Sequence, residues 1–317
     1  MNIFHYQELY EKWSQDAKKI ASMYQTPVTS KKFRMWVYDL QVRYPQIQIR
    51  TLAYTISGNE IIEVRVGEGP VQLHLNAGMH ANESICTNLL MAFISQYLFV
   101  LYCKSEDHSE FHRMFCKFTL SFVPLINPDG IDLLYDPKAI PYDLYERALQ
   151  IGQNCIEVTQ WKANICGVDL NNQFPAVWEK IFTLPFKVNK PAPRDFPGYA
   201  PLTENEALAL YDLVYQNQFQ AVLCLHTQGE EFYWGFLDYE PDLSQIQAEL
   251  FEAVSGYRAV RTIESYGGFK DWFILTFQKP GFTIEVGSGI NPLPLSDFEV
   301  CRKKVNEILF SYLFFYV

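Results

Sequence analysis

The sequence lacks the cysteine patterns of disulfide-bonded and structural-zinc proteins. Its cysteines are odd in number, and no two stand in a Cys-x-x-Cys arrangement. Disulfide frameworks use cysteines in pairs, and cysteine zinc clusters use closely spaced ones, so the sequence argues against both. Free thiols in a reducing, cytoplasmic setting fit best. The seven cysteines are Cys86, Cys103, Cys116, Cys155, Cys166, Cys224 and Cys301.

Positive charge is also scarce. The chain has 26 basic and 36 acidic residues, which gives a formal net charge of −10. Nucleic acids and anionic lipid surfaces bind through clustered positive charge. We therefore expect neither nucleic acid nor a membrane as a partner, although a locally basic pocket remains compatible with this balance. The sequence does not determine an oligomeric state.

Long hydrophobic runs and a signal peptide are missing as well. The most apolar run, residues 89–103, is interrupted by Ser95 and Gln96 and is shorter than the ~20 residues that span a bilayer. It predicts a buried helix. The first residues, Met-Asn-Ile-Phe-His-Tyr-Gln-Glu, have no basic region followed by an apolar one. We therefore predict a cytoplasmic protein.

The chain can form a large hydrophobic core, since 49% of its 317 residues are hydrophobic. Strand and helix patterns alternate, which predicts a single α/β domain with a mixed, mostly parallel, twisted central sheet flanked by helices. Residues 1–45 are predicted to be a helical extension packed on a main domain of residues 46–317. Thr203 and Glu206 form a capping-box pattern at one helix start. The expected strands are 47–52, 60–66, 71–75, 118–123, 221–226 and 281–286; the expected helices are 6–23, 83–103, 205–217, 243–255 and 297–317.

A histidine and a glutamate stand three residues apart where a predicted strand gives way to a predicted helix. In Asn76-Ala-Gly-Met-His80-Ala-Asn-Glu83, the first helical turn would direct His80 and Glu83 the same way. His226 ends another predicted strand, at the sheet edge where α/β proteins bind ligands. Two histidines and a glutamate form a catalytic zinc site, because one coordination position stays open. The pattern predicts a zinc hydrolase.

A second glutamate lies in an apolar strand. Glu285 has Phe282, Ile284 and Val286 as near neighbours. A carboxylate in such a setting is costly to bury unless it is paired or functional. It is either an ion-pair partner of a lysine or a general base whose raised pKa allows it to take a proton from water at the metal.

These features resemble the zinc metallocarboxypeptidases of the carboxypeptidase A superfamily. The resemblance covers residues 35–317, and within the superfamily it is strongest to the γ-D-glutamyl-L-diamino acid peptidases, which cleave peptidoglycan stem peptides. It implies one Zn²⁺ per chain and makes residues 46–317 a zinc peptidase catalytic domain. The landmarks are His80-x-x-Glu83, Asn127-Pro-Asp-Gly130, Gly167-Val-Asp-Leu-Asn171, the His226 strand, Gly267-Gly-x-x-Asp-Trp272 and the Glu285 strand.

The resemblance implies roles only where residues match. His80, Glu83 and His226 would hold zinc, Glu285 would activate water, and Asn171 would help to bind a substrate carboxylate.

Two positions depart from the family pattern. Asn172 stands where carboxypeptidases have an arginine that clamps a terminal carboxylate in a bidentate manner, so C-terminal trimming is disfavoured. Cys166 stands where an arginine usually polarises the scissile carbonyl. Loss of such a donor costs about 10²–10³ in kcat. Either Cys166→Arg would therefore raise activity, or Lys162 already supplies the charge.

Three further residues are candidates for substrate binding. Lys270 occupies the specificity position two residues after Gly268, and is either the cation at the base of the pocket or a solvated lysine on a turn. Arg194, in a proline-rich loop, is a second candidate for binding a carboxylate. Tyr266 lies near the position of the substrate-closing tyrosine, which itself aligns with Ile263.

The expected function is zinc-dependent hydrolysis of an amide bond in a peptidoglycan-derived peptide, γ-D-glutamyl–meso-diaminopimelate by resemblance. The expected partner is a small acidic peptide or muropeptide. Two alternatives stay open: a deacylase or carboxypeptidase acting on another acidic amide, and a zinc-containing peptide-binding protein with attenuated catalysis. Cys166 is the residue that keeps the second alternative open.

Overall fold

An eight-stranded sheet forms the centre of the molecule. The computed structural model describes residues 3–14, 20–102, 109–185 and 188–317. The strand order across the sheet is β1-β2-β4-β3-β5-β8-β6-β7. The strands are β1 (Gln48–Tyr54), β2 (Glu60–Val66), β3 (Val71–Asn76), β4 (Phe118–Val123), β5 (Ala221–His226), β6 (Glu231–Tyr233), β7 (Arg258–Val260) and β8 (Gly281–Glu285).

Four neighbouring strands at the centre of the sheet run parallel. They are β4, β3, β5 and β8, while β2 pairs antiparallel with β4 and β6 pairs antiparallel with β8. The predicted mixed, mostly parallel sheet is confirmed. Because parallel strands end at the same edge of a sheet, the segments that follow β3, β4, β5 and β8 meet there.

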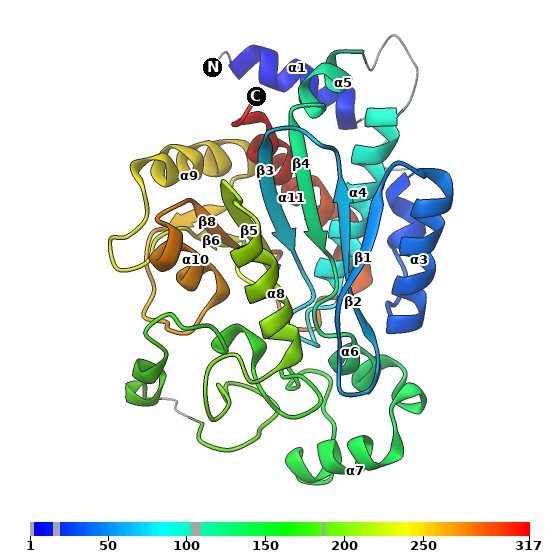
Figure 1. Cartoon of the computed structure of the whole chain (residues 1–317), viewed down its shortest axis with the longest axis vertical. Helices are drawn as coiled ribbons and strands as arrows, with labels where there is room; N and C mark the ends of the chain where they lie inside the picture. Colours follow the sequence, from blue (N-terminus) through cyan, green and yellow to red (C-terminus); the bar gives the residue numbers. More distant parts are fainter. Residues whose placement is uncertain (1–2, 15–19, 103–108, 186–187) are drawn as a thin grey trace.

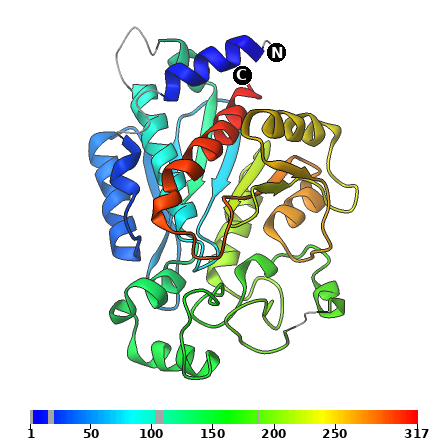
Figure 2. The same cartoon turned by 180° about the vertical axis from the view of Figure 1, so that it is seen from behind.

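Helices cover both faces of the sheet (Figures 1 and 2). Figure 1 shows α8 and α10 in front of the sheet, and Figure 2 shows α11 on the opposite face, which α4 and α9 also cover. The helices of eight residues or more are α1 (Ile3–Ser14), α3 (Ser30–Arg43), α4 (Ile85–Tyr102), α6 (Pro128–Tyr135), α7 (Tyr142–Ile151), α8 (Asn205–Gln216), α9 (Asp242–Ser255), α10 (Phe269–Phe277) and α11 (Phe298–Phe314).

The central strands alternate in side-chain direction, which divides the core into two layers. In β5, Leu223 and Leu225 pack with α4 and α11, whereas Val222 and Cys224 pack with α8 and α10. The latter face also carries Thr283 and Glu285 of β8, by the same period of two residues. A strand buried on both faces is apolar throughout, as the sequence of β5 predicted.

Helix α4 is the buried helix expected from the apolar run. It is long and apolar enough to cross a membrane by length and composition, yet 89% of it is buried within the fold. A helix that is buried between a sheet and other helices can have the same length and the same apolar composition as a membrane-spanning helix. Its apolar surface is covered by α11, α5 (Ser109–Phe115) and the sheet.

Several predicted boundaries need correction. The helix expected from residue 83 begins at Ile85, so His80 and Glu83 lie on the turn before it rather than in its first turn. The capping box is wrong: the helix has Glu204 as N-cap without a side-chain cap, and the Thr203 hydroxyl donates to Gln173 instead. The helix expected over 6–23 has its first part in α1, while residues 15–19 and Cys103 lie outside the described residues.

The N-terminal helices are part of the main core. Trp13 of α1 and Phe33 of α3 belong to the same buried cluster as the strands and α11. Trp13 is 1% exposed, and its ring centre lies 5.6 Å from that of Phe93 and 5.1 Å from that of Phe310. Helices α1 and α3 thus pack against the rest of the chain through large aromatic side chains.

We predict that Trp13→Ala destabilises the whole protein by about 3–5 kcal/mol, because it removes a buried aromatic side chain. Thermal unfolding should show a lower midpoint with a single transition. Met35→Ala is the matched control, since Met35 lies on α3 with 63% of its surface exposed, and it should leave the midpoint unchanged. An unchanged main transition in Trp13→Ala would mean that the N-terminal extension unfolds independently.

Candidate metal centre

Three of the central parallel strands deliver the candidate site. His80 lies in the loop that follows β3, His226 is the last residue of β5, and Glu285 is the last residue of β8. His226 and Glu285 are register partners in the β5–β8 pair, which places them side by side. Adjacent strand ends therefore bring together residues that are far apart in the sequence.

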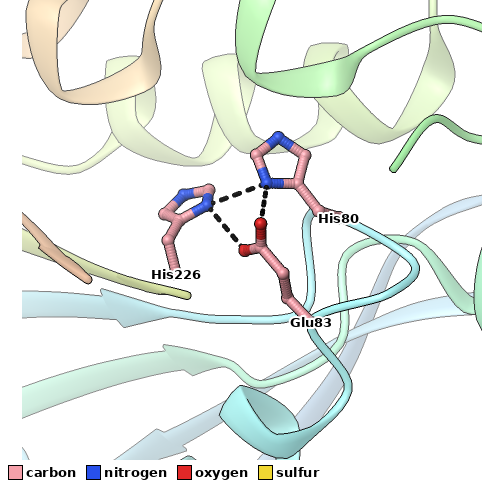
Figure 3. A group of neighbouring side chains, drawn as sticks. All are labelled: His80, Glu83 and His226. Atoms are coloured by element: carbon pink, nitrogen blue, oxygen red, sulfur yellow. Dashed lines mark hydrogen bonds and ion pairs between the residues drawn. The ribbon is translucent and has the colours of Figure 1, made fainter. Parts of the chain in front are cut away.

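His80, Glu83 and His226 converge on one point (Figure 3). His80 Nδ1 lies 2.9 Å from Glu83 Oε1, and His226 Nδ1 lies 3.2 Å from Glu83 Oε2. The two Nδ1 atoms are 3.1 Å apart. All three side chains are buried. The predicted cluster of two histidines and one glutamate thus exists in the fold.

The geometry of this cluster fits a tetrahedral metal ion. Ligand atoms about 2.0–2.2 Å from a zinc ion lie roughly 3.3–3.6 Å from one another, and the observed separations of 2.9–3.2 Å are close to that. Two histidine nitrogens that face each other also need a proton or a cation between them. Two neutral imidazole rings and one carboxylate form a donor set typical of catalytic zinc.

Asp169 orients one of the histidines from outside the cluster. His80 Nε2 donates to Asp169 Oδ1 at 3.1 Å, and the backbone N–H of Asn171 donates to the same oxygen at 3.1 Å. A carboxylate at the far nitrogen of a metal-binding histidine keeps the other nitrogen free for the metal. This role of Asp169 does not follow from the sequence alone, although Asp169 lies within the Gly167–Asn171 landmark.

The charges of the cluster depend on one another. Burial by itself lowers the pKa of His80, but the carboxylates of Glu83 and Asp169 outweigh it and raise the pKa to about 9. Burial raises the pKa of Glu83, and the two histidines more than reverse this, so its pKa is well below the ordinary value. Without a metal, the site holds a proton on His80 beside an ionised Glu83.

Glu285 has the opposite shift. Removal from water and the nearby Glu83 carboxylate raise its pKa to about 8, against the effect of Lys162 and His80. One of the two alternatives for Glu285 is an ion pair with a lysine. No ion pair of Glu285 is present among the described residues. A carboxyl group with a raised pKa beside a metal site is suited to accept and return a proton near neutral pH.

Lys162, the candidate for a replacement cation, and Cys166, which stands at the position of the expected arginine, have different surroundings. Lys162 is half-buried, and its charge acts on His80, His226, Asp169 and Glu285. The Cys166 thiol packs beside an apolar cluster, and the charges that act on it are not those of His80, Glu83 or His226. Burial raises its pKa to about 11, with the main further contributions from Glu204, Arg147 and Glu206.

Lys270 is neither solvated nor on a turn. It lies in the first turn of α10 with 6% of its surface exposed, so the solvated-lysine reading is wrong. Its ammonium forms an ion pair with Asp271 and donates to the Gly235 carbonyl at 2.8 Å. The predicted pocket cation is therefore already engaged within the protein.

The two asparagines support the loops around the site. Asn171 Oδ1 accepts a hydrogen bond from the Phe269 N–H at 3.2 Å, at the start of α10. The Asn172 carbonyl accepts one from Trp178 Nε1 at 2.8 Å. Both side chains are half-buried. The contact between Asn171 and Phe269 connects the Gly167–Asn171 landmark with the Gly267–Trp272 landmark.

The remaining two candidates lie on surface segments. Arg194 is exposed and pairs with its neighbour Asp195 at 2.9 Å. Tyr266 is half-buried, and the Lys180 ammonium lies 5.5 Å from the centre of its ring. The structure does not join either of them to the cluster of His80, Glu83 and His226 by a direct contact among the described residues.

Comparison with known families identifies the fold and the metal. A family model described as zinc carboxypeptidase matches residues 33–299. This chain belongs to the zinc carboxypeptidase family. It is accordingly a zinc metallopeptidase, a hydrolase whose cofactor is zinc, as the sequence predicted.

Individual relatives agree with the family. The chain is 40% identical over 279 residues to the gamma-D-glutamyl-L-diamino acid endopeptidase 1 of Lysinibacillus sphaericus, covering 88% of this chain and 70% of that protein. Among solved structures, thrombin activatable fibrinolysis inhibitor superposes with a TM-score of 0.71 at 16% identity, over 98% of this chain and 80% of the other. Carboxypeptidase A from Helicoverpa armigera gives 0.67 at 15% identity, over 96% and 80%. These two structures show the zinc carboxypeptidase fold alone.

If the cluster holds the zinc of this family, His226→Ala should abolish stoichiometric zinc binding, because the two ligands that remain bind zinc much more weakly. Elemental analysis after dialysis should find about one zinc per chain in the parent protein and close to none in the variant. His112→Ala is the control, since His112 lies on the exposed side of α5. Zinc retained by His226→Ala at parental affinity would place the metal elsewhere.

Zinc binding should also release a proton. Below its raised pKa of about 9, His80 is protonated in the metal-free protein, and zinc must displace that proton. The stability that the protonated His80 gives the metal-free protein is complete below about pH 6.5 and is lost as pH rises through about 9.

Apparent zinc affinity should therefore rise by about tenfold per pH unit between these limits. Calorimetry at pH 7.5 in two buffers of different ionisation enthalpy would measure the release. Heats that do not depend on the buffer would contradict it.

Proposed function

We propose that this chain hydrolyses the amide bond between the γ-carboxyl group of D-glutamate and meso-diaminopimelate in peptidoglycan-derived peptides. We further propose that His80, Glu83 and His226 hold the zinc ion and that Glu285 is the general base. The observation that carries the substrate is the 40% identity to a gamma-D-glutamyl-L-diamino acid endopeptidase over 88% of this chain. The residues that carry the chemistry are those of the buried cluster and its neighbour Glu285.

The proposed chemistry uses a zinc ion and the carboxylate of Glu285. Zinc, when bound, supplies a Lewis acid that polarises the scissile carbonyl and makes water easier to deprotonate. Glu285 takes a proton from water as the water oxygen bonds to the carbonyl carbon. It then gives the proton to the leaving nitrogen as the carbon–nitrogen bond breaks. The products are a free γ-carboxylate on D-glutamate and a free amine on diaminopimelate.

The surroundings of the site favour an acidic substrate that is not an ordinary C-terminal residue. Asn172 cannot provide the bidentate clamp that an arginine gives a terminal carboxylate. Lys162 and, on the exposed loop, Arg194 supply positive charge, although the chain as a whole carries −10. We assign Asn171 and Lys162 to substrate binding. Arg194 is a weaker candidate, because its guanidinium already pairs with Asp195. Lys270 is a weaker candidate, because Asp271 and the Gly235 carbonyl already engage it.

We place this activity in the cytoplasm, on precursor or recycled wall peptides. The six cysteines that the structure describes are free thiols, which agrees with a reducing compartment. The rivals are a deacylase or carboxypeptidase acting on another acidic amide, and a peptide-binding protein with weak catalysis. Incubation of the zinc-loaded protein with a panel of muropeptides, followed by mass spectrometry, separates the three.

Glu285→Gln should retain the fold and one zinc per chain while lowering kcat by about 10²–10⁴, because the amide cannot accept a proton. Turnover of a γ-D-glutamyl–diaminopimelate peptide, measured by chromatography, is the readout. Glu249→Gln is the control, since Glu249 is an exposed carboxylate on α9, and it should leave kcat unchanged. A Glu285→Gln variant as fast as the parent enzyme would remove Glu285 from the mechanism. A large fall in melting temperature would instead indicate a structural role.

A further inference from the structure

A row of four charged or polar side chains crosses the sheet at the candidate metal centre. His226 of β5 is the register partner of Glu285 of β8. Glu285 is in turn the partner of Glu231 of β6, and Glu231 is the partner of Arg258 of β7. Neighbouring strands lie about 4.7–4.9 Å apart. The row therefore leads in short steps from the candidate metal cluster to β7, the last strand of the sheet.

The four side chains lie on the same face of the sheet. The residues next to them in the sequence pack into the core cluster on the opposite face; these residues are Leu225, Phe232, Ala259 and Ile284. Since side chains alternate along a strand, the members of the row point the other way. His226 is buried, Glu285 and Glu231 are half-buried, and the Arg258 side chain is 72% exposed. The row thus runs from the buried centre to the surface.

Two carboxylates face each other within this row. Glu231 and Glu285 are directly opposite across the antiparallel β6–β8 pair, and like charges in that arrangement destabilise a sheet. Burial and the Glu83 carboxylate raise the pKa of Glu285 to about 8, and the Glu231 carboxylate adds to this rise. The ion pair of Glu231 with Arg258 offsets only part of the repulsion, because the arginine is largely exposed. A carboxylate kept in this place indicates a role in function rather than in stability.

Glu231 binds a different partner with each carboxylate oxygen. The Tyr233 hydroxyl donates a hydrogen bond to Oε1, and the Arg258 guanidinium pairs with Oε2. Carboxylates bind ammonium groups, and guanidinium groups bind carboxylates, through charge-assisted hydrogen bonds. Glu231 and Arg258 therefore offer both signs of charge side by side. This suits a ligand that carries an ammonium and a carboxylate on one carbon atom.

The other charged candidates have less suitable positions. Lys270 is buried with its ammonium on Asp271 and the Gly235 carbonyl. Arg194 and Asp195 also form an ion pair, but they lie on a surface segment outside the sheet. The pair on β6 and β7, in contrast, is held in register with the proposed general base.

The direction of the row fits the leaving half of the proposed substrate. Glu285 gives its proton to the leaving nitrogen in the proposed mechanism, so the residue that carries this nitrogen lies against Glu285. On the β5 side Glu285 has His226 as its neighbour, and on the β6 side it has Glu231. Diaminopimelate separates its two ends by three methylene groups, which span roughly 5 Å with bonds of about 1.5 Å. This span is close to one strand spacing, so the distal end reaches Glu231 and Arg258.

We propose that Glu231 and Arg258 bind the distal amino-acid end of the diaminopimelate residue, with its ammonium on Glu231 and its carboxylate on Arg258. This role rests on the proposed function, and it makes the two residues determinants of specificity that take no part in bond cleavage. The two charges of the ligand replace the ion pair between the side chains, so each charge keeps a partner. The Tyr233 hydroxyl holds the Glu231 carboxylate in place.

The kinetic test uses γ-D-glutamyl peptides that differ only at the distal end of the leaving residue. These residues are meso-diaminopimelate, L-2-aminopimelate, which lacks the distal ammonium, and L-lysine, which lacks the distal carboxylate. The parent enzyme should prefer diaminopimelate to each of the others by about 10–100-fold in kcat/KM, because each lacks a hydrogen bond to a charged group. Glu231→Gln should lose the preference over aminopimelate and keep that over lysine. Arg258→Gln should do the reverse.

Each preference is a ratio measured on one variant, so a change in the pKa of Glu285 affects both substrates alike. Glu230→Gln and Arg261→Gln are matched controls from the neighbouring positions. Glu230 pairs with Lys304, and Arg261 pairs with Glu240. Both controls should keep the two parental ratios. Zinc content and melting temperature should match the parent enzyme in all four variants.

The affinity for the uncleaved peptide gives a readout independent of turnover. In a Glu285→Gln background, where hydrolysis is slow, calorimetry can measure binding of the diaminopimelate peptide. Adding Glu231→Gln should weaken this binding by about 10–100-fold. Adding Glu230→Gln should not. Should Glu231→Gln fail to fold, Glu231→Asp replaces it, because the shorter side chain withdraws the carboxylate from the ligand.

Two outcomes distinguish this proposal from the proposed function. If the parent enzyme cleaves the diaminopimelate peptide but treats all three peptides alike, or if folded, zinc-loaded Glu231→Gln keeps both parental ratios, the distal site is wrong and the proposed reaction stands. A parent enzyme that cleaves none of the three peptides would overturn the proposed function, and the role of Glu231 and Arg258 with it.

Discussion

The buried carboxylate of Glu83 is the interaction on which the rest of the site depends. It is 3% exposed, it lies between His80 and His226, and it accepts a hydrogen bond from the Thr227 N–H at 3.1 Å. A buried charge is costly unless partners surround it, and removing one partner leaves the others destabilised. The arrangement that pairs these charges in the metal-free protein also gathers three ligand atoms on one side. If this cluster holds the zinc ion, as we propose, stability and zinc binding depend on the same contacts.

The parallel sheet makes this gathering possible. His226 follows His80 by 146 positions, yet their Nδ1 atoms are 3.1 Å apart, because β3 and β5 are neighbours that end at the same edge. Strands alone would leave the connecting loops free to vary. The side chain of Asn127 and the main chain of Ala81 tie the loops together. The accuracy of the site thus comes from buried hydrogen bonds between loops, with the sheet as their support.

Charge at the site differs from charge over the whole molecule. The net charge of −10 describes the chain as a whole, and it is the reason why the sequence predicts no nucleic-acid partner. Inside the site, Lys162 balances the carboxylates of Glu83 and Asp169. The resemblance to the family predicts arginine at the positions of Cys166 and Asn172. We propose that their replacement moves positive charge within the site and favours an acidic substrate other than an ordinary C-terminal residue.

The main strands, the α/β class and the set of His80, Glu83, His226 and Glu285 follow from the sequence. Apolar periodicity and short motifs are local properties, and strand ends in a parallel sheet must meet. The burial of Lys270 with its hydrogen bond to the Gly235 carbonyl, and the hydrogen bond between His80 and Asp169, are seen only in the folded protein, because these contacts join distant segments. For the same reason the turn before α4, and not its first turn, presents His80 and Glu83: the helix start depends on packing that no local pattern records.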